Sequence, residues 1–281
     1  MKKLLIVAVL LCFSAMCFGC TTIYAQGVSA ATDSSWKAVE NSGVLKIGID
    51  ENFAPISYYN ESDQPMGYGV DMASEVCRRL GVEAEFVSVT FGEAKDSLKE
   101  GAIDCIWSSN SCTELEADST NQSFSYLKGS QVLLCLSESS AQTLVDLKGQ
   151  RIGAKSGSIG EMALEKSTAF KSSLQSVGSY QDYSEAKKSL DGKKISAIVV
   201  DSFVAEYYQK QQPGLYTVLT KENGNTPEVL ETGDYCVEFR PRDDTLAVKI
   251  EETLNKMAED GTLSTLSKKW FSEDLSTVVS G

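Results

Sequence analysis

Two polar segments follow predicted strands and carry residue types that can bind an ammonium group. Ser108-Ser109-Asn110-Ser111-Cys112-Thr113 comes directly after a strand predicted at Ile103–Trp107. Asp201 comes directly after a very apolar strand predicted at Ile195–Val200. An ammonium group removed from water has three donors, and it needs an anion together with neutral acceptors. The carboxylate and the hydroxyl-rich turn meet that need, although they also fit a helix N-cap and a plain polar turn.

A glycine-rich turn in the second half of the chain could bind an anion. Ser156-Gly157-Ser158-Ile159-Gly160 precedes a helix predicted at Glu161–Lys166. Backbone N–H groups that are exposed at the start of a helix attract negative groups. Such a turn also serves as a simple strand-to-helix connector, and the sequence is compatible with both interpretations.

Alternating strand and helix patterns must position these segments. Short turns between the patterns indicate parallel, helix-covered sheets in two α/β units. The predicted strands are Val44–Ile49, Val82–Val87, Ile103–Trp107, Gln131–Leu136, Arg151–Ala154, one beginning at Val177, Ile195–Val200 and Tyr235–Phe239. The predicted helices are Val70–Leu80, Phe91–Lys99, Glu161–Lys166, Tyr183–Leu190, Ser202–Gln209, Leu246–Asp260 and Leu263–Trp270.

The N-terminus has the pattern of an export signal. Lys2 and Lys3 precede an apolar run from Leu4 to Phe13, which has signal-peptide length and is too short for a membrane span. We therefore predict a signal in residues 1–20, a small and polar linker in residues 21–36, and an extracytoplasmic protein.

Cys20 is the predicted lipidation site. Gly19 precedes it, as a lipoprotein cleavage site requires, although Phe18 and Cys17 fit that pattern poorly. The alternative is ordinary cleavage after Ala25 or Ala30. On the lipidation interpretation, a lipid anchor on the outer face of the cell membrane is the chain's only membrane attachment.

Composition excludes several functions. A formal net charge of −13 offers nothing to attract nucleic acid. The chain contains no histidine, and so lacks the commonest general base and zinc ligand. We therefore predict no catalytic residues, metal or cofactor. Five cysteines outside the export segment are scattered and odd in number, which favours buried free thiols: Cys77, Cys105, Cys112, Cys135 and Cys236.

A series of motifs occurs in order along nearly the whole mature chain: Asp50–Pro55 after the first strand, Gly67–Ala73, Leu98–Trp107, Asp146–Gly149, Gly153–Gly160, Ile195–Ser202, Asp260–Thr262 and Lys269–Phe271. Together they resemble the motifs of the type II, or family 3, extracellular solute-binding proteins of amino-acid ABC transporters. The resemblance implies a two-lobed, periplasmic-binding-protein-like clamp of α/β class with two hinge crossovers. Lobe 1 would contain residues 37–135 and 229–281, and lobe 2 residues 136–228. The crossovers would lie near Leu134–Glu138 and Thr226–Glu231.

The resemblance also assigns roles to the candidate site residues. Ser109 and Ser111, within the turn Ser108–Thr113, match positions that accept from the ligand ammonium, and Asp201 matches its carboxylate partner. Phe53 matches an aromatic residue that covers the ligand, although a plain core role suits it almost as well, and Asp50 would lie at the cleft mouth. Ser158 and Ile159 belong to a turn that binds the α-carboxylate in similar proteins, with Ile159 replacing the usual Ser or Thr.

The largest departure from the family pattern is Glu116, which stands where similar proteins carry an arginine that clamps the α-carboxylate. A carboxylate there would repel a ligand carboxylate. This predicts a solute with an ammonium group and either no α-carboxylate or a second cation. Glu116 could also turn to solvent, the protein could have degenerated, or Lys128 or the helix start at Ser158 could hold a carboxylate.

These features predict the extracellular component of an ABC importer, a monomer that binds a small amine-bearing solute and partners a membrane permease and its ATPase. A ligand-sensing receptor component is the first alternative. A dehydratase-like enzyme on the same scaffold is the second, but its acidic substrate would need cationic groups that the predicted pocket lacks.

Overall fold

The computed structural model describes residues 33–107, 112, 120–222 and 224–278, all but Asp33 within one compact unit, Ser34–Gly281. Its first helix, α2 (Ser35–Ser42), begins inside the predicted linker. None of the helices in the described part of the chain has the length and hydrophobicity that a membrane span requires.

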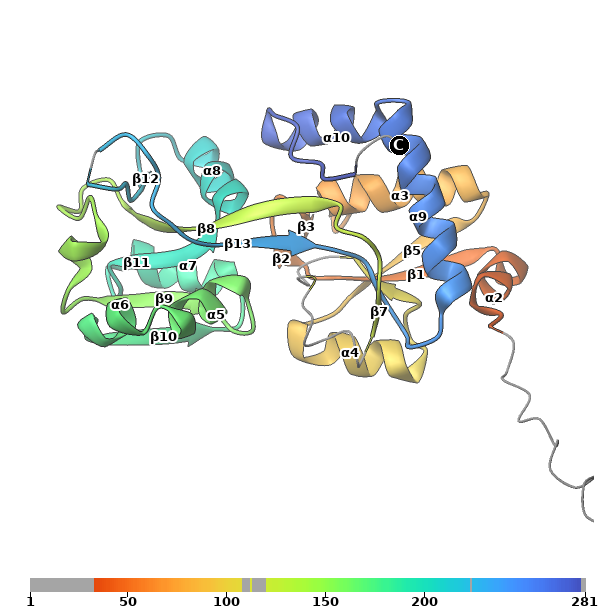
Figure 1. The fold of residues 1–281 in the computed structure, drawn as a ribbon, viewed down its shortest axis with the longest axis horizontal. Helices are drawn as coiled ribbons and strands as arrows, with labels where there is room; N and C mark the ends of the chain where they lie inside the picture. Colours follow the sequence, from red (N-terminus) through yellow and green to blue (C-terminus); the bar gives the residue numbers. More distant parts are fainter. Residues whose placement is uncertain (1–32, 108–111, 113–119, 223, 279–281) are drawn as a thin grey trace, which may run out of the picture. The chain divides into compact units, whose positions relative to one another are not determined.

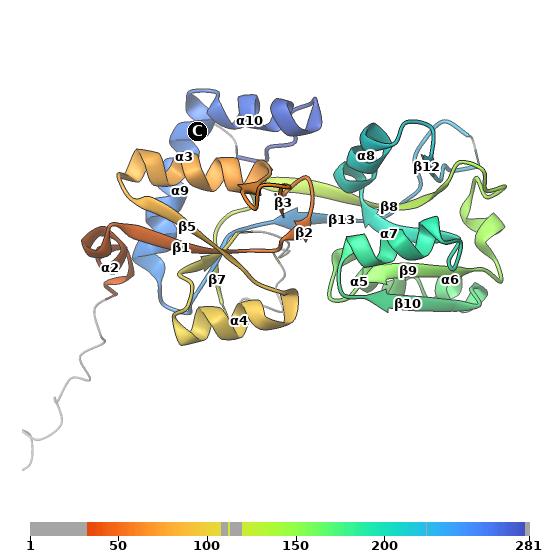
Figure 2. The ribbon, with the colours of Figure 1, turned by 180° about the vertical axis from the view of Figure 1, so that it is seen from behind.

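The first sheet has the strand order β5-β1-β6-β14-β7. Strand β1 (Val44–Ile49) is parallel to β5 (Glu83–Ser88) and to β6 (Cys105–Ile106), whereas β14 (Glu238–Phe239) runs antiparallel to both β6 and β7 (Asn121–Gln122). Figures 1 and 2 show helices α3 (Tyr68–Leu80) and α4 (Phe91–Glu100) on opposite faces of this sheet. The strands that the strand–helix alternation predicts to be parallel are parallel, and the sheet is mixed because the chain returns from its C-terminal half and inserts β14 in the opposite direction.

The second sheet is also mixed, with the order β10-β9-β11-β8-β12. Strand β9 (Arg151–Lys155) is parallel to β10 (Ser176–Tyr180) and β11 (Ala197–Asp201), and β8 (Leu127–Leu136) is antiparallel to β11 and β12 (Tyr216–Val218). A short turn of 3-10 helix, η1 (Leu144–Leu147), precedes β9. The helices of this part are α5 (Ile159–Lys166), α6 (Thr168–Ser173), α7 (Tyr183–Asp191) and α8 (Ser202–Gln211).

Two long strands connect these sheets. Strand β13 (Val229–Tyr235) is antiparallel to β8, with Tyr235 opposite Leu127 and Val229 opposite Val132. Leu134 and Leu136 already pair with β11 and β12. The first connection therefore lies earlier in the chain than the predicted crossover at Leu134–Glu138. In Figure 1 the two strands run side by side between the sheets.

A small third sheet and the C-terminal helices complete the fold. The small sheet consists of β2 (Asn52–Phe53), β3 (Ser57–Tyr59) and β4 (Pro65–Met66). Helices α9 (Asp244–Glu259) and α10 (Thr262–Phe271) pack against each other and against α3. Asp71 of α3 holds α10 by accepting from Trp270 Nε1 at 2.7 Å and from Lys269 Nζ at 2.6 Å.

The cysteines of the described region are free, as predicted. Cys77, Cys105, Cys135 and Cys236 are buried, and Cys112 is partly exposed. Burial raises the pKa of the Cys77 and Cys135 thiols to about 12, so both stay protonated and unreactive at neutral pH.

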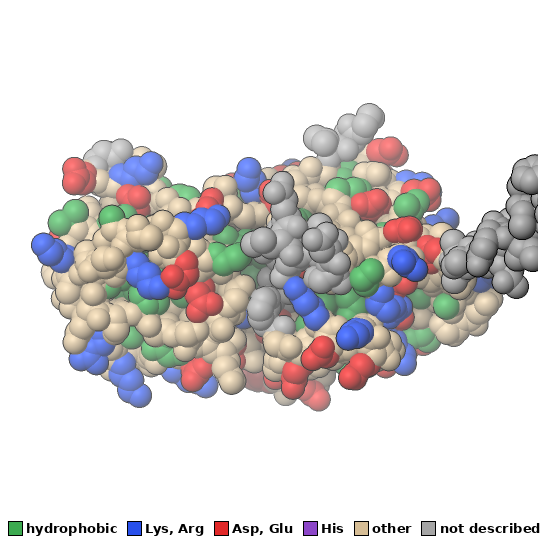
Figure 3. All heavy atoms as spheres, turned by 60° about the horizontal axis from the view of Figure 1, so that its bottom comes forward, with side chains coloured by type: hydrophobic (Ala, Val, Ile, Leu, Met, Phe, Trp, Pro, Cys, Tyr) green, Lys and Arg blue, Asp and Glu red, His purple; other side chains and the backbone are tan. Residues whose placement is uncertain are grey.

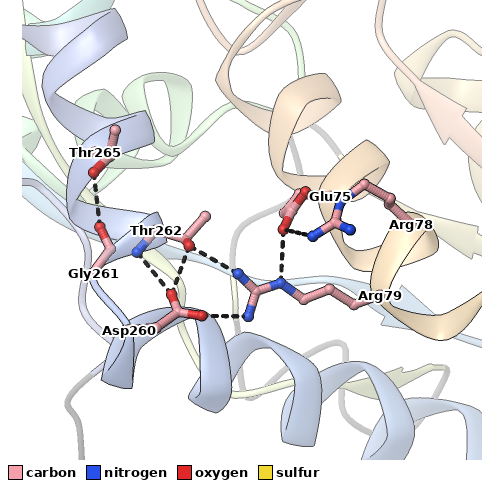
Figure 4. Close-up of polar contacts among 7 residues, drawn as sticks. All are labelled: Glu75, Arg78, Arg79, Asp260, Gly261, Thr262 and Thr265. Carbon is pink, nitrogen blue, oxygen red and sulfur yellow. Dashed lines mark hydrogen bonds and ion pairs between the residues drawn. The ribbon is translucent and has the colours of Figure 1, made fainter.

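An arginine network joins α3 to the turn between α9 and α10 (Figure 4). Arg79 donates to Glu75 at 2.8 Å, to Asp260 at 2.7 Å and to Thr262 at 2.8 Å. Arg78 donates to the same Glu75 carboxylate. The hydrogen bond from Arg78 lowers the pKa of Glu75 to about 2, and the bond from Arg79 lowers that of Asp260 to about 2.

These lowered pKa values predict an acid-dependent loss of stability. The ordinary values are 4.5 for Glu75 and 3.8 for Asp260. The network therefore stabilises the folded state above about pH 4, and this contribution is lost as the pH falls toward 2. We expect Arg79→Met to lower the thermal unfolding midpoint at neutral pH, with a difference from wild type that shrinks between about pH 5 and pH 2. Differential scanning calorimetry measures both midpoints. Arg78→Met, which removes only the more exposed arginine, should have a smaller effect; a pH-independent deficit in Arg79→Met would contradict the interpretation.

Candidate functional site

Asp201 lies at the end of β11 with 1% of its surface exposed. Its carboxylate accepts from Tyr183 Oη at 2.9 Å, from Tyr235 Oη at 2.5 Å, and from Gln131 Nε2. Although Asp201 stands at the N-cap position of α8, its side chain makes no capping hydrogen bond. The carboxylate is thus turned toward the strands that connect the sheets, which argues against the N-cap alternative.

The environment of Asp201 suits a cationic partner. Burial raises the pKa of its carboxyl group, while the hydrogen bonds from the two tyrosines and Gln131 oppose that shift. The Gln131 side chain is fully buried, and its Oε1 has no hydrogen-bond partner among the described residues. A carboxylate beside an unused amide oxygen offers the anion and neutral acceptor that an ammonium group requires.

Asp50 and Lys155 form a buried ion pair between the two sheets. Asp50 follows β1, Lys155 ends β9, and Lys155 Nζ lies 2.5 Å from Asp50 Oδ2. Only 3% of the Lys155 side chain and 11% of the Asp50 side chain are exposed. Lys155 therefore brings a positive charge next to the predicted site residue Asp50, where no cationic group is predicted from the sequence.

Two aromatic rings, those of Phe53 and Tyr183, lie against Lys155 of this ion pair. Phe53 is 1% exposed, and its ring centroid lies 5.7 Å from that of Tyr183, 6.0 Å from Phe203 and 6.1 Å from Tyr235. Lys155 Nζ lies 5.2 Å from the Phe53 centroid and 5.7 Å from that of Tyr183, within the range of cation–π attraction. Phe53 thus belongs to the core and also contacts the charged groups.

The glycine turn before α5 already holds an anion of its own chain. Gly157 N–H donates to Glu161 Oε2 at 2.7 Å, and Ser158, the N-cap, accepts from Glu161 N–H at 3.1 Å. Ile159 is buried and packs closely against Gly233. A Cβ added at Gly233 would lie 2.1 Å from Ile159 Cδ1. The turn is therefore well ordered, but part of its anion-binding capacity is used by Glu161.

A cavity of about 500 Å³ opens beside Asp50. Four of its lining residues are acidic, and none is Lys or Arg. The residues that line the cavity are Asp50, Glu51, Asn52, Ser88, Val89, Thr90, Gly92, Glu93, Ser156, Gln181 and Asp182. Such a lining attracts cations. Elsewhere, on the face in Figure 3, Lys and Arg side chains are mixed with Asp and Glu rather than gathered in a basic patch.

The structure brings together three of the predicted site residues, Asp50, Phe53 and Asp201, and places the turn of Ser158 and Ile159 after Lys155. The remaining predicted residues, Ser108, Ser109, Ser111, Thr113, Glu116 and Cys20, lie outside the described residues. Sequence reasoning missed Gln131, Lys155, Tyr183 and Tyr235. A lysine at the end of an otherwise buried strand, just before a glycine turn, was the available signal for Lys155.

Comparisons with known proteins agree with this architecture. The model of the bacterial extracellular solute-binding proteins, family 3, matches residues 45–273. The arginine-binding extracellular protein ArtP of Bacillus subtilis is 26% identical over 228 residues, or 81% of this chain and 86% of ArtP. The histidine-binding periplasmic protein of Escherichia coli is 27% identical over 233 residues, or 82% of this chain and 88% of that protein.

Solved structures show the same fold. The crystal structure of Tv2483 bound to L-arginine has a TM-score of 0.79 and 30% identity, covering 88% of this chain and 98% of its own. A substrate-binding protein of an ABC uptake transporter from Streptococcus pneumoniae with bound histidine has a TM-score of 0.79 and 28% identity, covering 87% and 98%. The chain therefore belongs to the bacterial extracellular solute-binding proteins, family 3.

Proposed function

We propose that this protein captures an amine-bearing amino acid or a closely similar amine outside the cell and delivers it to an ABC importer. The buried carboxylate of Asp201 supports this proposal most directly. It lies at the end of a central strand, beside an unused amide oxygen and the hydroxyl groups of Tyr183 and Tyr235. Relatives named for binding arginine and histidine also support an amine-bearing solute.

The proposed mechanism is closure of two lobes on the solute. Lobe 1 would be built on the first sheet and lobe 2 on the second, with the first connection between them earlier in β8 than the predicted boundary at residue 135. The antiparallel pair of β8 and β13 would serve as the hinge, since it connects the two sheets. A solute that contacts both lobes favours the closed state by its differential affinity. The closed monomer would then dock on a permease driven by an ATPase.

Residues outside the described part of the chain complete the proposed site. Ser109 and Ser111 would accept from the solute ammonium within the turn Ser108–Thr113. Glu116 would face a cationic part of the solute. The acidic lining of the cavity at Asp50 supports a cation-attracting entrance.

A thermal-shift screen tests the proposed function. The mature protein would be heated with basic and neutral amino acids, polyamines and quaternary amines, because a ligand that binds only the folded state raises its melting temperature. We expect amine-bearing solutes to raise the midpoint and dicarboxylates without an amine to leave it unchanged. A shift with the dicarboxylates alone would contradict the proposal.

We further propose that a lipid on Cys20 anchors the protein to the outer face of the membrane. Cys20→Ser should move the protein from the membrane fraction to the medium or periplasm, measured by immunoblotting of cell fractions. Intact mass measurement of the purified wild type should show a diacylglycerol-modified N-terminus. A wild-type chain that begins after Ala25 or Ala30 without lipid would contradict the anchor.

A further inference from the structure

Lys155 is the only buried lysine or arginine among the described residues, with 2% of its surface exposed. It ends strand β9, whose preceding residues Ile152, Gly153 and Ala154 are all buried. Replacing a buried ion pair by apolar residues is often neutral or stabilising. The fold alone therefore gives no reason for a lysine here, and a buried charge beside a cavity is a candidate functional group.

The partner of Lys155 is reachable from the cavity. Asp50 lines the cavity of about 500 Å³, and Ser156, the residue after Lys155, lines it as well. Asp50 therefore forms part of the cavity wall and Lys155 lies directly behind it, where a bound solute could exchange ion-pair partners with the pair.

The anion site at the start of α5 is partly occupied within the chain. Glu161 takes the N–H group of Gly157 and also accepts from Ser179 Oγ at 2.8 Å. Among the described residues, Lys155 is thus the strongest remaining group for a solute anion. It also lies close to the amine-binding carboxylate: the Tyr183 ring contacts Lys155, and the Tyr183 hydroxyl donates to Asp201.

We propose that Lys155 is a specificity-determining residue that binds the anionic group of the solute. This inference rests on the proposed capture of an amine. In the structure, Asp50 neutralises Lys155. On binding, the solute carboxylate takes the place of Asp50 at Lys155, while the solute ammonium pairs with Asp201. The site would then prefer zwitterions over amines that lack an anionic group.

Matched pairs of probes with and without a carboxylate test this role. Isothermal titration calorimetry on the mature protein would compare arginine with agmatine and histidine with histamine, its decarboxylated form. A charge-assisted hydrogen bond predicts a preference for the amino acid of about 10- to 100-fold in wild type. Lys155→Met keeps a similar volume without the charge, and should reduce that preference to about threefold or less without weakening amine binding.

A control and a second variant keep the test informative. Lys166→Met removes an exposed lysine that pairs with Glu231 and should leave the preference unchanged. Asp50→Asn keeps Lys155 but removes the carboxylate that competes with the solute for it. This variant should strengthen the preference for the amino acid over its decarboxylated form, and it remains informative even if Lys155→Met folds poorly. A preference that survives in Lys155→Met, or falls in Asp50→Asn, would overturn the role of Lys155 but not the capture of amines. A wild type that binds none of the four probes would overturn both.

Discussion

Asp201→Asn is expected to weaken binding of every amine-bearing solute by about 100-fold or more. Removing one partner of a buried, hydrogen-bonded charge pair costs about 2–5 kcal/mol, and each 1.4 kcal/mol is about tenfold in affinity. Asparagine can keep its oxygen toward Tyr235 and Gln131 and donate from its amide nitrogen to Tyr183 Oη, because a tyrosine hydroxyl can also accept, so the variant should fold. Calorimetric titration with arginine and histidine measures the loss.

The pH dependence of binding gives a second measurement for Asp201. Because burial raises the pKa of Asp201 above its ordinary 3.8, protonation begins at a higher pH than for an exposed aspartate. Wild-type affinity for an amine should fall as the pH is lowered through that raised value, whereas Asp201→Asn should lack this dependence.

Asp191→Asn is the matched control for Asp201→Asn. Asp191 also accepts a hydrogen bond from a tyrosine, Tyr216, at 2.5 Å, but it ends α7 outside the site. We expect unchanged affinity in this variant. Equal losses in the two variants would show that Asp201 acts through structure rather than as the ammonium partner.

Gly67→Ala is expected to destabilise the protein by about 3–5 kcal/mol. Gly67 has φ +133°, and a Cβ there would lie 2.1 Å from the backbone oxygen of Ile56 and 2.5 Å from its carbonyl carbon. Neither atom can rotate away, because hydrogen bonds from Tyr68 N–H to Pro55 O and from Gly69 N–H to Ile56 O fix the segment, each at 2.9 Å. Backbone strain and overpacking each contribute about 1–3 kcal/mol.

Gly81→Ala is the control for Gly67→Ala. Gly81 caps the other end of the same helix with φ +72°, and a Cβ there meets no atom within 4 Å. Only the left-handed conformation opposes alanine, which costs about 1 kcal/mol. Urea unfolding measures both variants, and a midpoint shift in Gly67→Ala no larger than that in Gly81→Ala would contradict the close approach to Ile56.

The local elements were largely predictable from periodicity. Strand Val44–Ile49 has its predicted bounds, and the helix predicted at Val70–Leu80 begins only two residues earlier, at Tyr68. Strand direction was not predictable in the same way. The pairing of Glu238 with Ile106 joins residues far apart in the sequence, and no local pattern shows whether such a return is parallel or antiparallel.

The site was predictable where it depends on strand ends, and unpredictable where it depends on tertiary contacts. Asp201 follows an apolar strand, so its position at a sheet edge could be inferred. Tyr183 starts a helix and Tyr235 ends a connecting strand, and nothing local indicates that both hydroxyls reach one carboxylate. The buried strand before Lys155 was a signal for its burial, but its partner was not predictable, because the counter-charge comes from Asp50 of the other sheet.

The three donors on Asp201 have a consequence for binding kinetics. Tyr183, Tyr235 and Gln131 hold the carboxylate in one orientation before any solute arrives. A preorganised group loses little conformational entropy on binding, so more of its interaction energy appears as affinity. Loosening this support, as in Tyr235→Phe, would leave the charge in place but allow it to reorient. Such a change should shorten the residence time of the solute more than it slows its arrival.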